Sequence, residues 1–147
     1  MRNVFMLWPG LLILVLLMGC STVRTTNAQP QADILSGSWR MEKWIGYDTV
    51  SVAFPQGLPV LVVDTEAQSV SGSNGCNSIM GKVRYNREAA TIQIYEIVST
   101  KMFCQTVPES EFHQALASIN SYRVTQESLS LLKGTEEIMV LTRDQAP

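Results

Sequence analysis

The sequence predicts an α+β fold: a small β-rich domain, either a twisted antiparallel sheet or a half-open barrel, with one amphipathic helix packed on it. Beyond residue 32, turn residues recur about every eight to twelve positions and the apolar segments between them are short, which favours strands. Only residues 108–120 have apolar residues at helical spacing. A chain of 147 residues has room for one such domain.

Short alternating or continuous apolar segments predict the strands. The run at residues 60–64 is nearly continuous and β-branched, which is typical of a buried strand. We expect residues 47–59 to be irregular, because Pro55, Gly57 and Pro59 interrupt regular structure. The expected strands are residues 39–45, 60–64, 68–72, 80–85, 91–97, 122–125, 128–132 and 137–142.

The expected helix, residues 108–120, has the signals of a helix start and one apolar face. Pro108 suits the first turn, and Glu109 and Glu111 suit the positive end of the helix dipole. The side chains that share one face are Phe112, Ala115, Leu116 and Ile119. This face is expected to pack on the sheet.

The first twenty residues read as an export signal. Arg2 precedes an apolar stretch, residues 4–18, that is shorter than the roughly 20 residues a membrane-spanning helix needs. The stretch ends in Leu-Met-Gly-Cys, which resembles the lipobox of bacterial lipoproteins, although Met18 is bulkier than the usual residue. The resemblance implies cleavage before Cys20 and acylation of its side chain.

An alternative export signal would be cleaved after residues 26–28, Thr-Asn-Ala, and would release a soluble protein. That site lies about ten residues beyond the apolar stretch, whereas the lipobox directly follows it. The division is therefore a signal peptide (1–19), a lipidated cysteine with a polar tether (20–32) and a folded domain (33–147). Ser21 resembles the sorting signal that permits delivery to the outer membrane, so we expect a lipid-anchored protein of the cell envelope.

The charge of the chain argues against nucleic acid as a partner. The formal net charge is −2, with 11 basic and 13 acidic residues, and Arg2 is expected to be removed with the signal. The remaining basic residues are scattered, so they form no stripe that could neutralise phosphates.

Two motifs stand out in the domain. The first, residues 72–77, reads Gly-Ser-Asn-Gly-Cys-Asn with Gly81 after it, and the second, residues 99–104, reads Ser-Thr-Lys-Met-Phe-Cys. With Glu109, the Ala-Leu pair at 115–116 and the Leu-x-Leu at 129–131, they resemble the META domain family, the family of the heat-shock protein HslJ, over residues 37–142. The resemblance implies a compact β-rich domain with one helix, often lipid-anchored, with no established enzymatic activity and a link to folding stress.

The glycine-rich motif has two interpretations. Three glycines within ten positions indicate backbone that other residues cannot adopt or that is approached too closely for a Cβ. Asn74 and Asn77 can hydrogen-bond nearby backbone. The motif is therefore either a structural corner or a ligand site.

Cys76 and Cys104 are expected to form a disulfide, because both enter an oxidising compartment and Cys20 is used by the lipid. The rival hypothesis is a thiol nucleophile with His113 as its base. His113 is the only histidine of the chain, and it lies on the helix face away from Phe112. An oxidised cysteine cannot act as a nucleophile. We therefore predict no catalytic residue.

A metal or cofactor is not expected either. Two cysteines and one histidine are too few for a closed zinc site, and a disulfide would remove the thiolates. Asp64 and Glu66 lack the further acidic residues of a calcium loop.

The aromatic residues either form the core or line a pocket for an apolar ligand. Trp44, Tyr47 and Phe54 flank the irregular segment, so they are the candidates for a binding surface.

The sequence thus predicts a non-enzymatic envelope lipoprotein that binds or stabilises another envelope component. Its expected partners are the membrane, through Cys20, and an envelope protein or apolar ligand. The alternative is a carrier that holds an apolar ligand or lipid in a half-open barrel, and the third hypothesis is a thiol-dependent enzyme.

Overall fold

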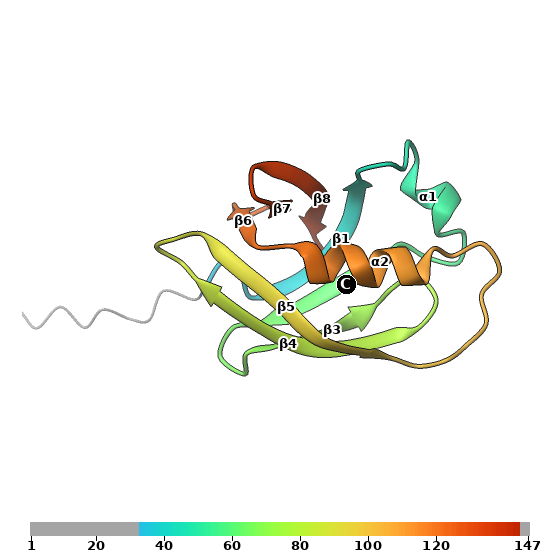
Figure 1. The fold of residues 1–147 in the computed structure, drawn as a ribbon, viewed down its shortest axis with the longest axis horizontal. Helices are drawn as coiled ribbons and strands as arrows, with labels where there is room; N and C mark the ends of the chain where they lie inside the picture. Colours follow the sequence, from blue (N-terminus) through green and yellow to red (C-terminus); the bar gives the residue numbers. More distant parts are fainter. Residues whose placement is uncertain (1–32, 145–147) are drawn as a thin grey trace, which may run out of the picture. The chain divides into compact units, whose positions relative to one another are not determined.

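Antiparallel strands make up most of residues 33–144, the part of the chain that the computed structural model describes (Figure 1). In chain order the elements are β1 (Gly37–Trp44), α1 (Val50–Ala53), β2 (Val60–Asp64), β3 (Ser69–Ser73), β4 (Ser78–Asn86), β5 (Thr91–Ser99), α2 (Glu109–Ser118), β6 (Ser121–Val124), β7 (Ser128–Lys133) and β8 (Glu136–Arg143). Neither helix in these residues is long and apolar enough to cross a membrane.

Each strand pairs with the next one along the chain, and β8 pairs with β1, so the sheet closes on itself as a barrel. The predicted antiparallel sheet is confirmed, but it is closed where a half-open arrangement was expected. The barrel is weakly paired between β5 and β6, which share a single residue pair, Thr91 with Ser121. Helix α2 connects these two strands and packs against β5.

Core side chains fill the inside of the sheet. Along β1, Trp39, Met41 and Trp44 are buried while the residues between them are more exposed, as expected for a strand with one face on a core. Phe112 and Leu116 bring α2 into the same core. The largest fully buried side chains are Trp39, Phe54, Phe112, Leu35, Met41, Leu61, Ile79, Leu116, Ile119, Leu129, Leu131 and Met139.

A bulge interrupts the pairing of β4 with β5. Lys82 lies opposite Tyr95 and Met80 opposite Val98, so Glu96 and Ile97 share the place opposite Gly81. Glu96 has a positive φ of 53°, and a Cβ on Gly81 would lie 3.1 Å from the Tyr95 carbonyl oxygen. A side chain at residue 81 would therefore crowd the bulged strand.

The helix predicted at residues 108–120 corresponds to α2, but the described residues contain a second helix as well. Residues 50–53 form this helix, α1, inside the segment expected to be irregular. This helix is one turn, closed by the Phe54 N–H donating to the Val50 carbonyl at 2.9 Å. One turn is too short to produce an apolar period in the sequence.

Candidate functional site

The two sequence motifs meet at one end of β4 and β5, together with the first turn of α2. Asn74 and Asn77 are fully buried there, and they are the two buried polar residues of the described chain. We call the cluster of Asn74, Asn77, Ser99, Thr100 and Glu109 the polar corner. A buried amide must be hydrogen-bonded to be tolerated, so the partners of the two asparagines define this site.

Asn74 shapes its own loop. Its Oδ1 accepts hydrogen bonds from the Cys76 N–H at 3.1 Å and the Asn77 N–H at 2.7 Å. Its Nδ2 donates to Glu109 Oε1 at 2.8 Å, which ties the loop to the start of α2. This use of the side chain on its own backbone confirms the prediction for Asn74.

Asn77 joins the loop to the second motif. Its Oδ1 accepts from Thr100 Oγ1 and from the Met102 N–H, both at 2.7 Å. Its Nδ2 donates to the Met102 carbonyl at 3.1 Å and to the Glu109 carboxylate at 3.2 Å. Ser99 Oγ also donates to Glu109 Oε1, at 3.1 Å, so this carboxylate is shared by three side chains.

The glycines explain why the first motif folds in this way. Gly72 has φ 134°, and a Cβ there would overlap the Val60 carbonyl oxygen of the neighbouring strand. Gly75 has φ 88°, and its Cβ would lie 2.9 Å from the Gly57 carbonyl oxygen and against the Phe54 ring. Of the two interpretations of this motif, these contacts favour a structural corner, because its buried polar groups are used internally.

A disulfide joins Cys76 to Cys104, as predicted, with their Cα atoms 6.0 Å apart and a sequence separation of 28. Neither sulfur is therefore a free thiolate in this form. His113 is half-buried one helical turn after Glu109, and its Nε2 lies 3.4 Å from Asn74 Nδ2. The structure thus brings this histidine to the polar corner, which the helix-face argument did not predict.

The segment between the polar corner and Cys104 exposes two large apolar side chains. Met102 is 60% exposed and Phe103 is 92% exposed. We call these two residues the apolar tip. Its backbone is held on one side by the bonds of Asn77 to Met102 and on the other by the disulfide. The sequence did not predict that Met102 and Phe103 are exposed.

Trp44, Tyr47 and Phe54 do not form the exposed binding surface that was expected, because two of them are buried and Tyr47 is half-buried. Trp44 is 5% and Phe54 is 2% exposed, and both rings belong to the core. Tyr47 is half-buried and stacks on Trp44 with ring centroids 4.3 Å apart. The irregular chain around α1 folds over the core, so its aromatic residues fill the interior instead of lining a surface.

A groove leads away from the polar corner between β5 and α2. Its first part, about 790 Å³, is lined by residues 99–103 and by the first turns of α2 as far as His113. A smaller hollow of about 290 Å³ follows between residues 94–97 of β5 and His113, Gln114 and Ala117 of α2. The last, about 560 Å³, lies between residues 91–93 and the end of α2, and also contacts Ala117. We call these three hollows the β5–α2 groove.

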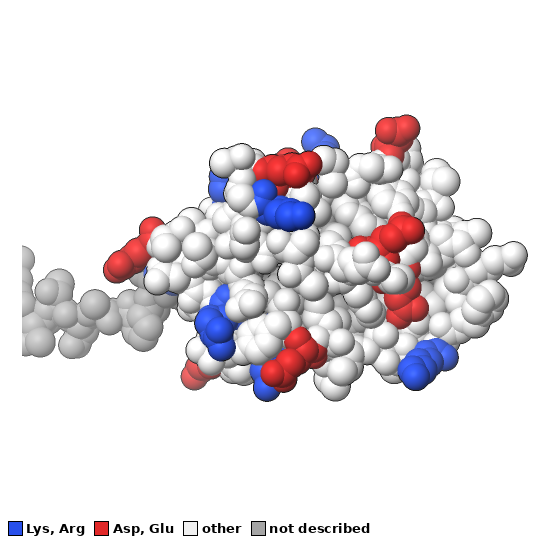
Figure 2. All heavy atoms as spheres, in the orientation of Figure 1, with Lys and Arg blue, Asp and Glu red and all other residues white. Residues whose placement is uncertain are grey.

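Charge is uneven along this groove. Acidic side chains gather over the beginning of α2 on the face shown in Figure 2, where Glu109 and Glu111 lie in its first turn. The hydrogen bond from Tyr47 to Glu111, together with burial and the nearby carboxylate charge, raises the pKa of Tyr47 to about 12. Lys101 lines the same end of the groove, so two carboxylates and one ammonium leave a net formal charge of −1 there.

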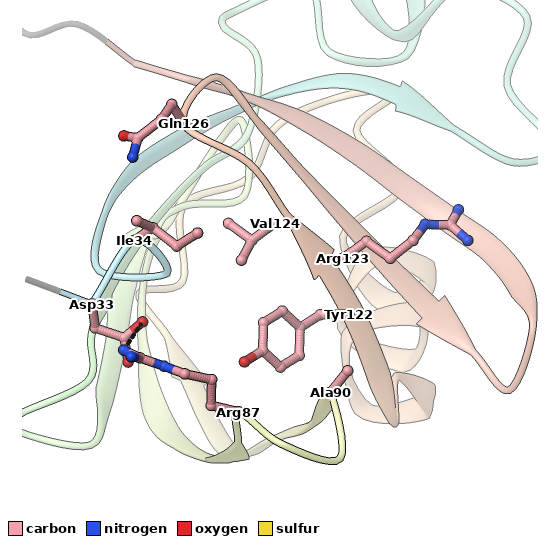
Figure 3. A pocket seen from close by; sticks show the side chains of 8 residues that line it. All are labelled: Asp33, Ile34, Arg87, Ala90, Tyr122, Arg123, Val124 and Gln126. Carbon is pink, nitrogen blue, oxygen red and sulfur yellow. Dashed lines mark ion pairs between the residues drawn. The ribbon is translucent and has the colours of Figure 1, made fainter. Parts of the chain in front are cut away.

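The opposite end of β4 and β5 has a surface pocket and an ion pair (Figure 3). A surface pocket of about 650 Å³ is lined there by Asp33, Arg87 and Tyr122 with several apolar side chains, and Asp33 pairs with Arg87 at 3.1 Å. Burial raises the pKa of Asp33, but hydrogen bonds from Tyr85, the Leu35 N–H and Arg87 outweigh it, so this pKa lies below its ordinary value. Burial also raises the pKa of Tyr122.

The remaining predicted sites lie elsewhere. Cys20, the predicted lipidation site, is outside the described residues, as are the signal peptide and the tether. Asp64 accepts hydrogen bonds from the Glu66 and Ala67 N–H groups, at 3.0 and 2.8 Å, and so holds a turn. Between residues 33 and 144 no group of three or more potential metal ligands is clustered.

Solved structures of other proteins share this fold. Solved structures that resemble it include a protein from Burkholderia xenovorans studied by NMR, with 21% identity over 76% of this chain and 83% of that one, at a TM-score of 0.60. A crystallised DUF4847 family protein from Bacteroides vulgatus shares 16% identity over 76% of this chain and 94% of its own, at a TM-score of 0.53. At these identities the likeness concerns the fold alone.

No curated protein sequence matches the chain. The model of the META domain matches residues 32–146, which include the polar corner, the disulfide and α2. The matched range covers most of the chain and agrees with the resemblance that the motifs indicate. The chain therefore belongs to the META domain family.

Proposed function

We propose that this protein is a non-enzymatic envelope lipoprotein that binds another envelope component through the apolar tip, Met102 and Phe103. The observation that carries this proposal is the exposure of Phe103, at 92%, on a segment held by the disulfide and by Asn77. Exposed aromatic side chains on rigid backbone are typical anchors of protein interfaces. Because the backbone is already ordered, binding there would lose little conformational entropy.

The position of the tip relative to the start of the domain fits a tethered binding protein. Asp33 pairs with Arg87, which follows the end of β4, whereas the tip follows the last residue of β5 at the other end of these strands. Strands of nine residues span about 30 Å. The tip therefore lies at the end of the β4–β5 pair opposite to Asp33, the residue at which the described chain begins.

Two observations support this proposal over its alternatives. A carrier for an apolar ligand needs an open interior, and here Trp39, Phe54 and Phe112 occupy the inside of the sheet. A thiol-dependent enzyme needs a thiolate, and Cys76 and Cys104 are bonded to each other. A role in folding stress would follow if the bound component is a protein of the envelope.

Substitution of the tip tests the proposal in cells that lack the gene. We expect Phe103→Ser combined with Met102→Ser to lose complementation of the deletion phenotype, at unchanged abundance and melting temperature. Val52→Ser is the matched control, because Val52 is also an apolar side chain that is largely exposed, at 75%, but lies on α1. Full complementation by the tip variant would contradict the proposal.

The anchor is tested in the same strains. Incorporation of a fatty-acid analogue should label the wild type and spare Cys20→Ala. Equal labelling of both proteins would remove the lipid anchor from the proposal while leaving the test of the tip unaffected.

A further inference from the structure

We infer that an extended peptide segment binds in the β5–α2 groove by adding a strand to the free edge of β5. The inference rests on the proposed function and names the chemistry of its partner. Three features of the described residues carry it: an edge without a neighbouring strand, a groove along that edge, and the charge at one end of the groove.

The edge of β5 is free along most of its length. β6 continues the sheet only at Thr91, where the Ile92 N–H donates to the Asn120 carbonyl at 3.2 Å and the Tyr122 N–H donates to the Ala90 carbonyl at 3.0 Å. Polar backbone groups of alternate residues face the same side of a strand. The N–H and C=O of Ile94 therefore face the side where, in the described chain, no strand is paired with it. A row of such groups is a template for another strand.

The β5–α2 groove gives that strand a place to lie. Its three hollows follow β5 from Thr91 to Ser99, the first two sharing His113 and the last two sharing Ala117. Phe112 and Leu116 point α2 into the core. The side of the helix that faces the groove carries His113, Gln114 and the small Ala117. The nine residues of β5 correspond to about 30 Å of extended chain.

The bulge at Glu96 lies in the middle of this edge. Glu96 and Ile97 line the central hollow, and Glu96 pairs with Lys82 on β4. A bulge bends its strand and shifts which groups face the edge. It therefore divides the free edge into two short stretches that an added strand would follow in turn.

The charges of the groove complement a basic side chain at one end of the peptide. Glu111 is exposed at the beginning of α2, next to Glu109, and Lys101 lines the same hollow. The central hollow has apolar walls at Ile94, Ile97 and Ala117 and polar ones at Glu96, His113 and Gln114. An extended peptide with alternating side chains and a basic residue near Glu111 matches both surfaces. The apolar tip lines the same end of the groove, so one partner can contact both.

The experiment uses nonapeptides selected from a random displayed library on the full-length protein in detergent. The best peptide is then made in two versions, N-methylated at the odd or at the even positions, and its Kd is measured for each. Because only alternate amides of an added strand face β5, we expect one version to bind at least about 10-fold more weakly and the other to bind within about 2-fold of the parent.

A pair of variants places the peptide in the groove. Ala117→Trp should fill the shared wall of two hollows and weaken binding about 10-fold, while Ala67→Trp, at an exposed position in the β2–β3 turn, should leave it unchanged. Unaltered circular dichroism of both variants keeps the comparison valid. A peptide whose affinity is insensitive to Ala117→Trp, or equally sensitive to both N-methylated versions, would overturn the inference.

Two other outcomes would also count against it. A selection that returns no peptide would overturn it, as would a dimer that dissociates in Ala117→Trp, because the groove would then hold a second copy of the chain. Failure of these tests with Phe103 still required in cells would leave the proposed function standing. If cells do not require Phe103 but the peptide binds as expected, the proposal for the apolar tip is contradicted and the inference about the β5–α2 groove stands.

Discussion

The two ends of the β4–β5 pair are held by different interactions. At the end near residue 77, buried amides, a carboxylate and a disulfide connect the glycine motif, the second motif and α2. At the end near residue 87, an ion pair with the Arg87 side chain 58% exposed lies beside an open pocket. Buried groups that lose their partners are far more costly than exposed ones. Stability is thus concentrated at the end that presents Phe103 to solvent.

Among changes at the two ends, removing the disulfide is expected to lower the free energy of unfolding most. Combining Cys76→Ala with Cys104→Ala should lower the free energy of unfolding by about 3 to 4 kcal/mol, because the bond closes a long loop in the unfolded chain. Urea unfolding followed by tryptophan fluorescence measures the change. A loss below about 1 kcal/mol would show that the polar corner holds this end without the covalent bond.

Substituting Asn77, which precedes β4, and Asn86, its last residue, compares the two ends directly. Asn77→Ala should lower the free energy of unfolding by about 3 kcal/mol, because it leaves Glu109 and the Met102 backbone short of partners in a buried place. Asn86→Ala, at the other end of the strand, removes one exposed bond from the Ala89 N–H and should cost about 1 kcal/mol or less. Equal losses on urea unfolding would contradict the difference between the ends.

Replacing Asp33 is expected to change the free energy of unfolding least. Its pKa is lower in the folded state than the unfolded value of about 3.9, so its charge stabilises the protein above that pH and this contribution is lost as pH falls through the folded pKa. Asp33→Asn should cost less than about 1 kcal/mol at pH 7, since Arg87 is well exposed. Below pH 4 the difference should shrink, and urea midpoints at pH 7 and pH 3 measure it. A difference that grows in acid would contradict the pKa assigned here.

Much of the sheet is predictable from the sequence because each strand carries its own apolar pattern. The run at 60–64 and the alternation at 80–85 lie within the observed β2 and β4. The glycines of the first motif are predictable for the same local reason, since Gly75 needs a positive φ. Local patterns of this kind identified the elements without their neighbours.

The parts that were missed depend on distant contacts. The polar corner joins Asn77 to Met102 and Glu109, 25 and 32 residues away, and no local pattern encodes that pairing. Trp44 and Phe54 were expected at the surface because their segment looked irregular, yet the segment folds over the core. The β5–α2 groove exists because β6 leaves β5 after one pair, which the strand pattern of β5 does not reveal.

The order in which the strands pair also affects how the chain folds. Every strand pairs with its neighbour in sequence, and β1 pairs with β8 as well, which brings Trp39 opposite Arg143 across about a hundred residues. Local hairpins close quickly, while contacts between distant residues are formed slowly because they require a large loss of chain entropy. The guanidinium of Arg143 lies 4.1 Å from the centre of the Trp39 ring. In a variant whose other two tryptophans are replaced by phenylalanine, the fluorescence of Trp39 during refolding would report the late step in which the first and last strands meet.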